Sequence, residues 1–266
     1  MRAAVACALT ALACGAQAAG CAAPLYLTFD TGHMGVAPLV AEVLRRQDVR
    51  VTFFLASEKT LDGGSSLDDA WAPWWKARAA EGHVFGSHTF DHVYWRGDRA
   101  ERDGGGFDMR PSAGPQAGVS RMMTPAQYCA ELARPAARLA AMTGGAGRMA
   151  AIFRAPGGKT SPALLAAASR CGWTHVGWSP AGFLGDELSS ERFPNELLLK
   201  KALRDIRPGD ILLAHLGIWS RQDAWAPAVL EPLIVGLKAR GHCFATLAEH
   251  PTLGEAARRP APVSVP

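Results

Sequence analysis

Two histidines that stand four residues apart are the side chains of this sequence best suited to chemistry. His88 and His92 lie in residues 86–92, directly after a short apolar run. On a helical turn this spacing puts both imidazoles on one face, within reach of a single cation. Imidazole nitrogen is a ligand that Zn²⁺ and its neighbours prefer. The pair predicts a site for a divalent metal, Zn²⁺ first and Co²⁺ or Ni²⁺ as alternatives, whereas two unrelated histidines in a solvated loop are the competing interpretation.

Three further ionisable residues stand where apolar segments end, and these are Asp30, Arg154 and His215. A carboxylate at the end of a buried strand is costly unless it is paired or catalytic. The planar fork of an arginine suits such a carboxylate. Each residue also has a structural explanation, because Asp30 could cap a helix, Arg154 could form a surface ion pair and His215 could be a satisfied core histidine.

Apolar runs alternate with amphipathic segments along the chain. The expected strands are residues 25–30, 51–55, 84–87, 152–154, 174–178, 211–214 and 244–247, and the expected helices are residues 36–46, 74–81, 125–139, 162–169, 197–206 and 229–240. Alternation of this kind implies an α/β fold with a parallel sheet, and about seven or eight units favour a barrel over an open sheet. Since the carboxyl ends of barrel strands share one face, the five ionisable residues are expected to converge there.

Three segments fall outside this alternation. Residues 59–73 are rich in Gly, Ser and Asp, and residues 94–123 carry three consecutive glycines without helical or strand periodicity, so both are expected to be long loops. Residues 251–266 are expected to be a disordered tail.

Trp219 and Trp95 directly follow the two histidine motifs, so they are candidates for stacking on a sugar ring, with structural packing as the alternative.

The amino-terminal residues predict export. One arginine, an Ala/Val/Leu run and an Ala-x-Ala ending make residues 1–18 a secretory signal peptide, so the folded domain is expected to span residues 19–250 in the periplasm or outside the cell. A lipid anchor on Cys21 is a minority alternative. No segment is long enough to span a membrane. The net charge of +4 is spread without a dense Lys/Arg block, which argues against nucleic acid as a partner.

Four cysteines remain after the predicted signal peptide, and these are Cys21, Cys129, Cys171 and Cys243. Export permits disulfides, and their spacing matches no zinc-finger pattern. Cys171 and Cys243 each precede a late strand and are one candidate pair, although the sequence does not fix the pairing.

Five segments together carry a resemblance to a known family, and these are residues 28–32, 81–92, 154–156, 178–179 and 208–215. In order and spacing they resemble the NodB-type polysaccharide deacetylases, carbohydrate esterase family 4, from about Leu25 to His250. The resemblance implies a distorted (β/α) barrel. It also implies hydrolysis of the N-acetyl group of N-acetylglucosamine units in peptidoglycan, a chitin-like oligomer or poly-N-acetylglucosamine.

The same resemblance implies a role for each site residue. The implied metal ligands are His88 and His92, the general base is Asp30, the residue that orients it is Arg154, the general acid is His215, and the substrate-binding residues are Leu213, Pro156 and Trp219. In this scheme the metal polarises the acetamide carbonyl as a Lewis acid. The base takes a proton from water, and the acid protonates the departing amine.

The sequence departs from the family pattern in two places. Thr31 stands where the family has a second aspartate that binds the metal, which predicts weaker metal affinity unless Asp30, His33 or Asp91 takes its place. The strand after Arg154 lacks its usual aspartate, and Asp186 is the candidate to orient His215. The alternative functions are therefore a carbohydrate-binding barrel with weakened catalysis and an enzyme for a small N-acyl or linear amide.

Overall fold

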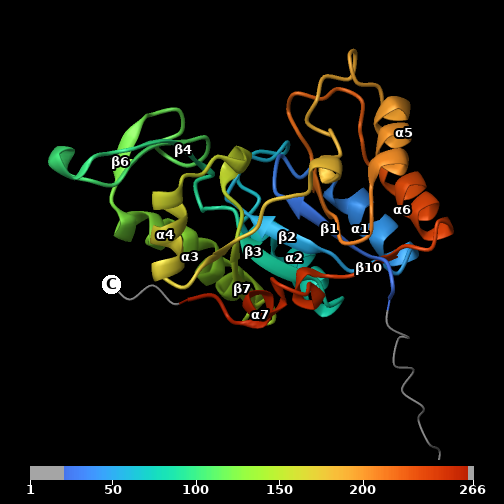
Figure 1. Ribbon diagram of the computed structural model, residues 1–266, viewed down its shortest axis with the longest axis horizontal. Coiled ribbons are helices and arrows are strands. Elements are labelled where there is room, and N and C mark those ends of the chain that lie inside the picture. The colour runs from blue at the N-terminus through green and yellow to red at the C-terminus, as the bar shows by residue number, and fades with distance from the viewer. Residues whose placement is uncertain (1–20, 263–266) are drawn as a thin grey trace, which may run out of the picture.

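A computed structural model describes residues 21–262, so the predicted signal peptide at 1–18 and the last residues of the predicted tail lie outside the described residues. Within this range seven strands form one parallel sheet (Figure 1): β1 Pro24–Asp30, β2 Thr52–Leu55, β3 Val84–Ser87, β7 Met149–Phe153, β8 Thr174–His175, β9 Ile211–His215 and β10 Cys243–Phe244. The order is β10-β1-β2-β3-β7-β8, and β9 also pairs with β1. A bridge between Phe183 and Leu213 spans the gap from β8 to β9, which makes the expected distorted barrel.

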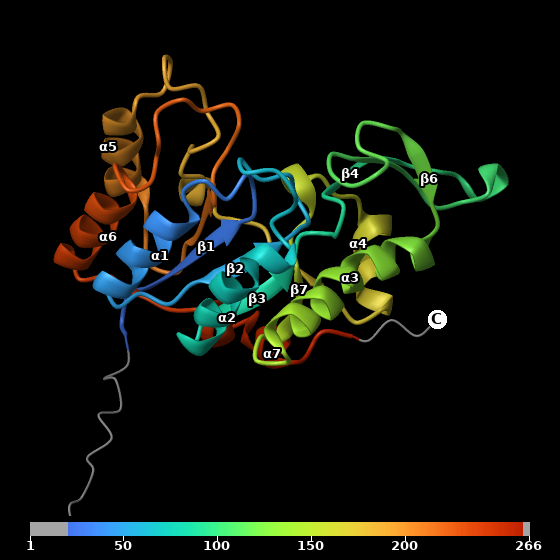
Figure 2. The same ribbon diagram turned by 180° about the vertical axis from the view of Figure 1, so that it is seen from behind.

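Seven helices of the described chain accompany the strands: α1 Ala37–Arg46, α2 Ala72–Ala80, α3 Pro125–Thr143, α4 Pro162–Arg170, α5 Asn195–Asp205, α6 Leu230–Ala239 and α7 Gly254–Arg258. Figure 2 shows α2 and α3 in front of β2, β3 and β7. Helix α3 begins at a capping box between Thr124 and Gln127 and ends at Gly144, whose φ of 63° suits glycine. Within residues 21–262, none of these helices is both long and apolar enough to cross a membrane.

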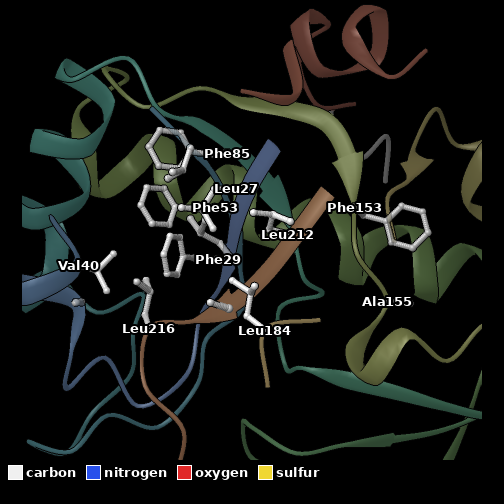
Figure 3. Close-up of a cluster of buried hydrophobic side chains, with 14 of the residues drawn as sticks. Leu27, Phe29, Val40, Phe53, Phe85, Phe153, Ala155, Leu184, Leu212 and Leu216 are labelled. Carbon is white, nitrogen blue, oxygen red and sulfur yellow. The ribbon is translucent and has the colours of Figure 1, made fainter. Parts of the chain in front are cut away.

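A ladder of three phenylalanines holds neighbouring strands in register. Phe29 pairs with Phe53, and Phe53 pairs with Phe85, across β1, β2 and β3. Their ring centroids lie 5.9 and 6.2 Å apart, and Figure 3 shows the three rings pointing to the same side, near Val40 of α1. Each buried phenylalanine stabilises the fold by about 1.5–3 kcal/mol. With the register fixed in this way, the polar residues that follow these strands emerge at one edge.

Residues 94–123 are not the long loop that the sequence suggested. They form most of a three-stranded antiparallel sheet of β4 Val93–Asp98, β5 Phe107–Pro111 and β6 Arg121–Met123, which lies to one side of the barrel above α3 and α4 in Figure 1. Phe107, Met109 and Pro111 of β5 are buried, and they alternate with half-buried Asp108 and exposed Arg110. This alternation spans too few residues, between glycine-rich turns, to give a clear period in the sequence.

The expectation of a disordered tail is wrong for residues 251–262. Helix α7 packs on β7, and Ala257 on α7 is buried. The amide of Ala151 donates to the carbonyl of Arg259 at 2.8 Å, and the amide of Ala261 donates to the carbonyl of Met149 at 2.8 Å. Backbone pairing to an edge of β7 therefore orders a segment whose Pro, Ala and Arg composition gives no strand signal.

The disulfides of the described residues are Cys21–Cys243 and Cys129–Cys171, so the candidate pairing of Cys171 with Cys243 is wrong. Cys243 lies in β10, which pairs with Pro24 and so comes beside Cys21. Cys171 directly follows α4, which packs against α3 and its Cys129. A lipid anchor on Cys21 would need the same sulfur atom, and the disulfide uses it.

Candidate active site

The carboxyl edge of the sheet brings the five ionisable residues of the sequence together. Asp30 and His215 are directly paired in the register of β1 and β9, and Arg154 follows β7. His88 follows β3 and His92 precedes β4. A cavity of about 460 Å³ opens here, and its wall includes Asp30, His88, His92, Tyr94, Trp178 and His215. The elements thus bring one carboxylate, one guanidinium and three imidazoles to a single site.

Asp30 is a buried carboxylate held by Arg154. The guanidinium Nη1 donates to Asp30 Oδ1 at 2.8 Å, while Nη2 donates to the carbonyl of Gly177 at 3.1 Å. Its carbon Cζ lies 4.3 Å from the centre of the Phe54 ring. Burial alone would raise the pKa of Asp30, but Arg154, with His88 and His215, holds it below its usual value. Asp30 is therefore ionised at neutral pH and can accept a proton.

His88 presents one ring nitrogen to the cavity. Its Nδ1 lies 2.9 Å from the carbonyl oxygen of Arg154, which can only accept, so Nδ1 carries the hydrogen and Nε2 keeps its lone pair. This Nε2 lies 3.2 Å from His92 Nε2 and 3.4 Å from Asp30 Oδ2. Burial, assisted by His92 and opposed by Asp30, lowers the pKa of His88 to about 4. The imidazole is therefore neutral and able to ligate.

His215 faces the same cavity in the opposite protonation state. Its Nδ1 lies 3.1 and 3.2 Å from the two carboxylate oxygens of Asp186, and its amide donates to Asp186 Oδ2 at 2.6 Å. Burial would lower the pKa of His215, but Asp186, with Asp30 and Glu187, raises it to about 9. His215 is therefore protonated at neutral pH. The structure places Asp186 where the sequence suggested it could orient this histidine.

The spacing of the two imidazoles fits a shared metal ion. Zinc–nitrogen distances of 2.0–2.1 Å put two ligand atoms about 2.9–3.4 Å apart, and the Nε2 atoms of His88 and His92 are separated by 3.2 Å. Across residues 21–262, no three His, Cys, Asp or Glu side chains are arranged, as they stand, to hold a metal. The hydroxyl of Thr31 is turned away and accepts from the amide of Ala56 at 3.0 Å.

Of the three substitute ligands considered from the sequence, Asp30 lies at the site, with Oδ2 3.4 Å from His88 Nε2, while His33 and Asp91 make other contacts. The His33 ring packs against Trp219 with centroids 5.2 Å apart, and its Nδ1 accepts from the amide of Gly35. Asp91 pairs with Arg134 of α3, where its Oδ2 lies 3.0 Å from the guanidinium Nη1. Both side chains are committed to structural contacts.

Residues 18–176 match the family described as polysaccharide deacetylase, which is more than half of the chain. The chain belongs to the polysaccharide deacetylase family. A chitooligosaccharide deacetylase of Azorhizobium caulinodans is 28% identical over 234 residues, covering 84% of this chain and 92% of the relative. The peptidoglycan-N-acetylmuramic acid deacetylase PdaA of Bacillus subtilis is 26% identical over 227 residues, covering 84% and 69%.

Solved structures agree on the fold of this deacetylase family member. A family 4 acetyl xylan esterase from Clostridium thermocellum, solved with a cobalt ion, superposes with a TM-score of 0.62 at 22% identity, covering 91% of this chain and 99% of the other. At this level of identity the likeness establishes the distorted barrel, while the chemistry depends on the residues described above.

The predicted substrate-binding residues of this deacetylase family member are only partly at the cavity. Leu213 and Trp219 line it, and Trp219 is 61% exposed. Pro156 is buried, and its neighbour Gly157 lines the cavity instead. The cavity wall also contains residues that sequence reasoning did not single out, namely Glu58, Lys59, Ser112 and Glu187. Glu58 lies three residues after the end of β2, whereas His88 directly follows β3, so the search at strand ends did not reach Glu58.

Proposed function

We propose that this chain removes acetyl groups from N-acetylglucosamine units of a polysaccharide and releases acetate. One observation carries the proposal. Asp30 and His215 face one cavity, and their pKa values are displaced in opposite directions, below the usual value for the carboxyl and to about 9 for the imidazole. A base and an acid kept in complementary protonation states are what hydrolysis of an amide requires.

Each residue of the site has its own role in this hydrolysis. Asp30 accepts the proton of the attacking water, and Arg154 holds the carboxylate in place and ionised. His215 gives its proton to the departing amine, and Asp186 fixes the imidazole that does so. A divalent metal held by His88 and His92, Zn²⁺ by preference, would polarise the acetamide carbonyl as a Lewis acid.

The surroundings of the cavity favour an exported enzyme for a sugar polymer. Trp178, Trp219 and Tyr94 offer flat rings on which sugars stack, and Leu213 offers an apolar contact for the acetyl methyl group. The two disulfides suit an oxidising compartment outside the cytoplasm. The curated relatives act, by their names, on chitooligosaccharide and on peptidoglycan. Peptidoglycan, chitin-like oligomers and poly-N-acetylglucosamine are the substrates to test first.

The proposal predicts acetate release from N-acetylglucosamine oligomers by the zinc-supplemented protein, and its loss on chelation. His88→Ala should reduce the rate by at least about 100-fold, since it removes a metal ligand rather than an outer contact. Coupled measurement of acetate, with mass spectrometry of the oligomer, checks both expectations. Undiminished release by the His88→Ala variant would rule out the metal-dependent mechanism.

Thr31 favours a second candidate, a carbohydrate-binding barrel whose catalysis is weakened or lost. Its hydroxyl is a poorer metal ligand than a carboxylate and is already bonded to the amide of Ala56. Oligosaccharide binding by calorimetry without acetate release at saturating zinc would support this candidate over the enzyme.

A further inference from the structure

Glu58 is a carboxylate at the cavity that the proposed mechanism does not use. It lies just beyond β2, at the same edge of the sheet as Asp30 and His88. Its amide donates to Ser66 Oγ at 3.0 Å and its carbonyl accepts from the amide of Ser66 at 2.8 Å, so its backbone is fixed on both sides. The residue is held in place rather than carried on a free loop end.

The Glu58 side chain lies beside the imidazole of His92. Its Oε1 lies 4.0 Å from His92 Nδ1, which also contacts Ser112 Oγ at 2.5 Å, and the Glu58 side chain is only 19% exposed. Its Oε2 is buried and has no hydrogen-bond partner. A buried carboxylate oxygen without a partner is costly, and a bound cation would remove that cost.

The chain after β2 runs beside the chain after β1. The amide of Thr31 donates to the carbonyl of Phe54 at 3.0 Å, and the amide of Ala56 donates to Thr31 Oγ1 at 3.0 Å. Position 58 is therefore two residues from a direct contact of position 31. A glutamate side chain is one methylene longer than that of an aspartate. From position 58 its carboxylate can therefore reach the same part of the cavity as an aspartate at position 31.

We propose that Glu58 supplies the acidic ligand of the metal site, in place of the aspartate that the family resemblance puts where Thr31 stands. The inference rests on the proposed function. With His88 and His92 it would make a set of two histidines and one glutamate, an established ligand set for catalytic zinc, once its carboxylate turns from His92 Nδ1 toward the two Nε2 atoms. This set leaves Asp30, already bonded to Arg154, free to act as the base.

Zinc titration by calorimetry tests the assignment on the disulfide-bonded mature chain. Glu58→Gln keeps the shape of the side chain and removes its charge, and loss of a direct ligand should weaken zinc affinity by more than about 100-fold, beyond the range of an outer contact. The matched control is Glu187→Gln, a carboxylate on the same cavity beside His215, which should leave zinc affinity unchanged. A smaller loss in Glu58→Gln, or an equal loss in both variants, overturns the proposal.

A rescue variant separates ligation from a general effect on the fold. Adding Thr31→Asp to the Glu58→Gln variant should restore zinc affinity, because a carboxylate then returns to the family position. Circular dichroism on each variant confirms that the fold is kept, and failure of the rescue in a folded double variant counts against the proposal.

Acetate release, measured on the same preparations, keeps the two proposals apart. If zinc binding depends on Glu58 but the wild type releases no acetate, the proposed function fails and the metal assignment stands. If the wild type releases acetate and Glu58→Gln binds zinc equally well, the assignment fails and the function stands.

Discussion

Asp30 and His215 are neighbours in the register of β1 and β9, yet their surroundings drive their pKa values apart. Burial opposes charge on both side chains. Arg154, with His88 and His215, outweighs burial at the carboxyl, and Asp186, with Asp30 and Glu187, outweighs it at the imidazole. Since each partner is itself buried and bonded to backbone groups, the two protonation states are properties of the folded site.

Asp186→Asn should move the basic limb of the pH–rate profile to lower pH. His215 with a pKa of about 9 stays protonated through neutral pH, and the variant loses the negative charge that raises this value. Because the folded pKa lies above the unfolded value of about 6.5, protonated His215 also stabilises the fold below that pH, and the contribution is lost as pH rises through about 9. Profiles of kcat/KM on an N-acetylglucosamine oligomer measure the limb, and an unmoved limb would refute the role of Asp186.

Arg154→Met should destabilise the fold by about 3–5 kcal/mol, because it leaves the buried carboxylate of Asp30 without its countercharge. Urea unfolding measures the change in the free energy of unfolding. The double variant with Asp30→Asn removes both charges and should recover part of the loss. A loss below about 1 kcal/mol in the single variant would contradict this expectation. It would mean that Arg154 does not offset the cost of burying the Asp30 carboxylate.

At the scale of elements, the phenylalanine ladder between β1, β2 and β3 explains why the site residues share one edge. Fixed register carries each strand end to the same level, so Asp30, Glu58 and His88 meet although the chain separates them. Helix α2 covers the ladder on its outer side, as the packing of Phe53 against Trp74 and Trp75 shows.

Phe53→Ala should therefore lower the free energy of unfolding by about 3–5 kcal/mol. Phe53 is completely buried between Phe29 and Phe85, so truncation leaves a cavity in the ladder. Leu39→Ala on α1 is the control, since this leucine is exposed and should change stability by no more than about 0.5 kcal/mol. Chemical denaturation measures the free energy of unfolding of both variants. Similar losses would contradict the claim that the phenylalanine ladder stabilises the sheet.

The parallel strands and the helices between them were predictable from sequence, but the small antiparallel sheet and α7 were not. The parallel strands and helices carry enough apolar residues to show their period, and the strand-end rule found Asp30, Arg154 and His215. The small sheet β4–β6 depends on pairing between three short strands, and α7 on backbone bonds to β7, which composition does not reveal. Glu58 was missed because nothing in its local sequence shows that it faces His92.

At the scale of the whole molecule, contacts between distant parts of the chain hold the distorted barrel together. Cys21–Cys243 joins residues 222 positions apart and ties the start of the domain to β10. The bridge from Phe183 to Leu213 draws the loop that carries Asp186 against β9, which places this carboxylate on His215. The position of His215 and Asp186 thus depends on the bridge between Phe183 and Leu213. The position of Asp30 and Arg154 depends on β1 and β7.

Acetate release by Asp30→Asn at saturating zinc tests the central claim most directly. The variant keeps the size of the side chain and removes the group that accepts the proton, so the rate should fall by at least about 100-fold, as expected when a positioned base is lost. Zinc affinity should remain measurable, because His88 and His92 are intact. A rate within about threefold of wild type would contradict the assignment of Asp30 as the base, because loss of a positioned base lowers the rate far more.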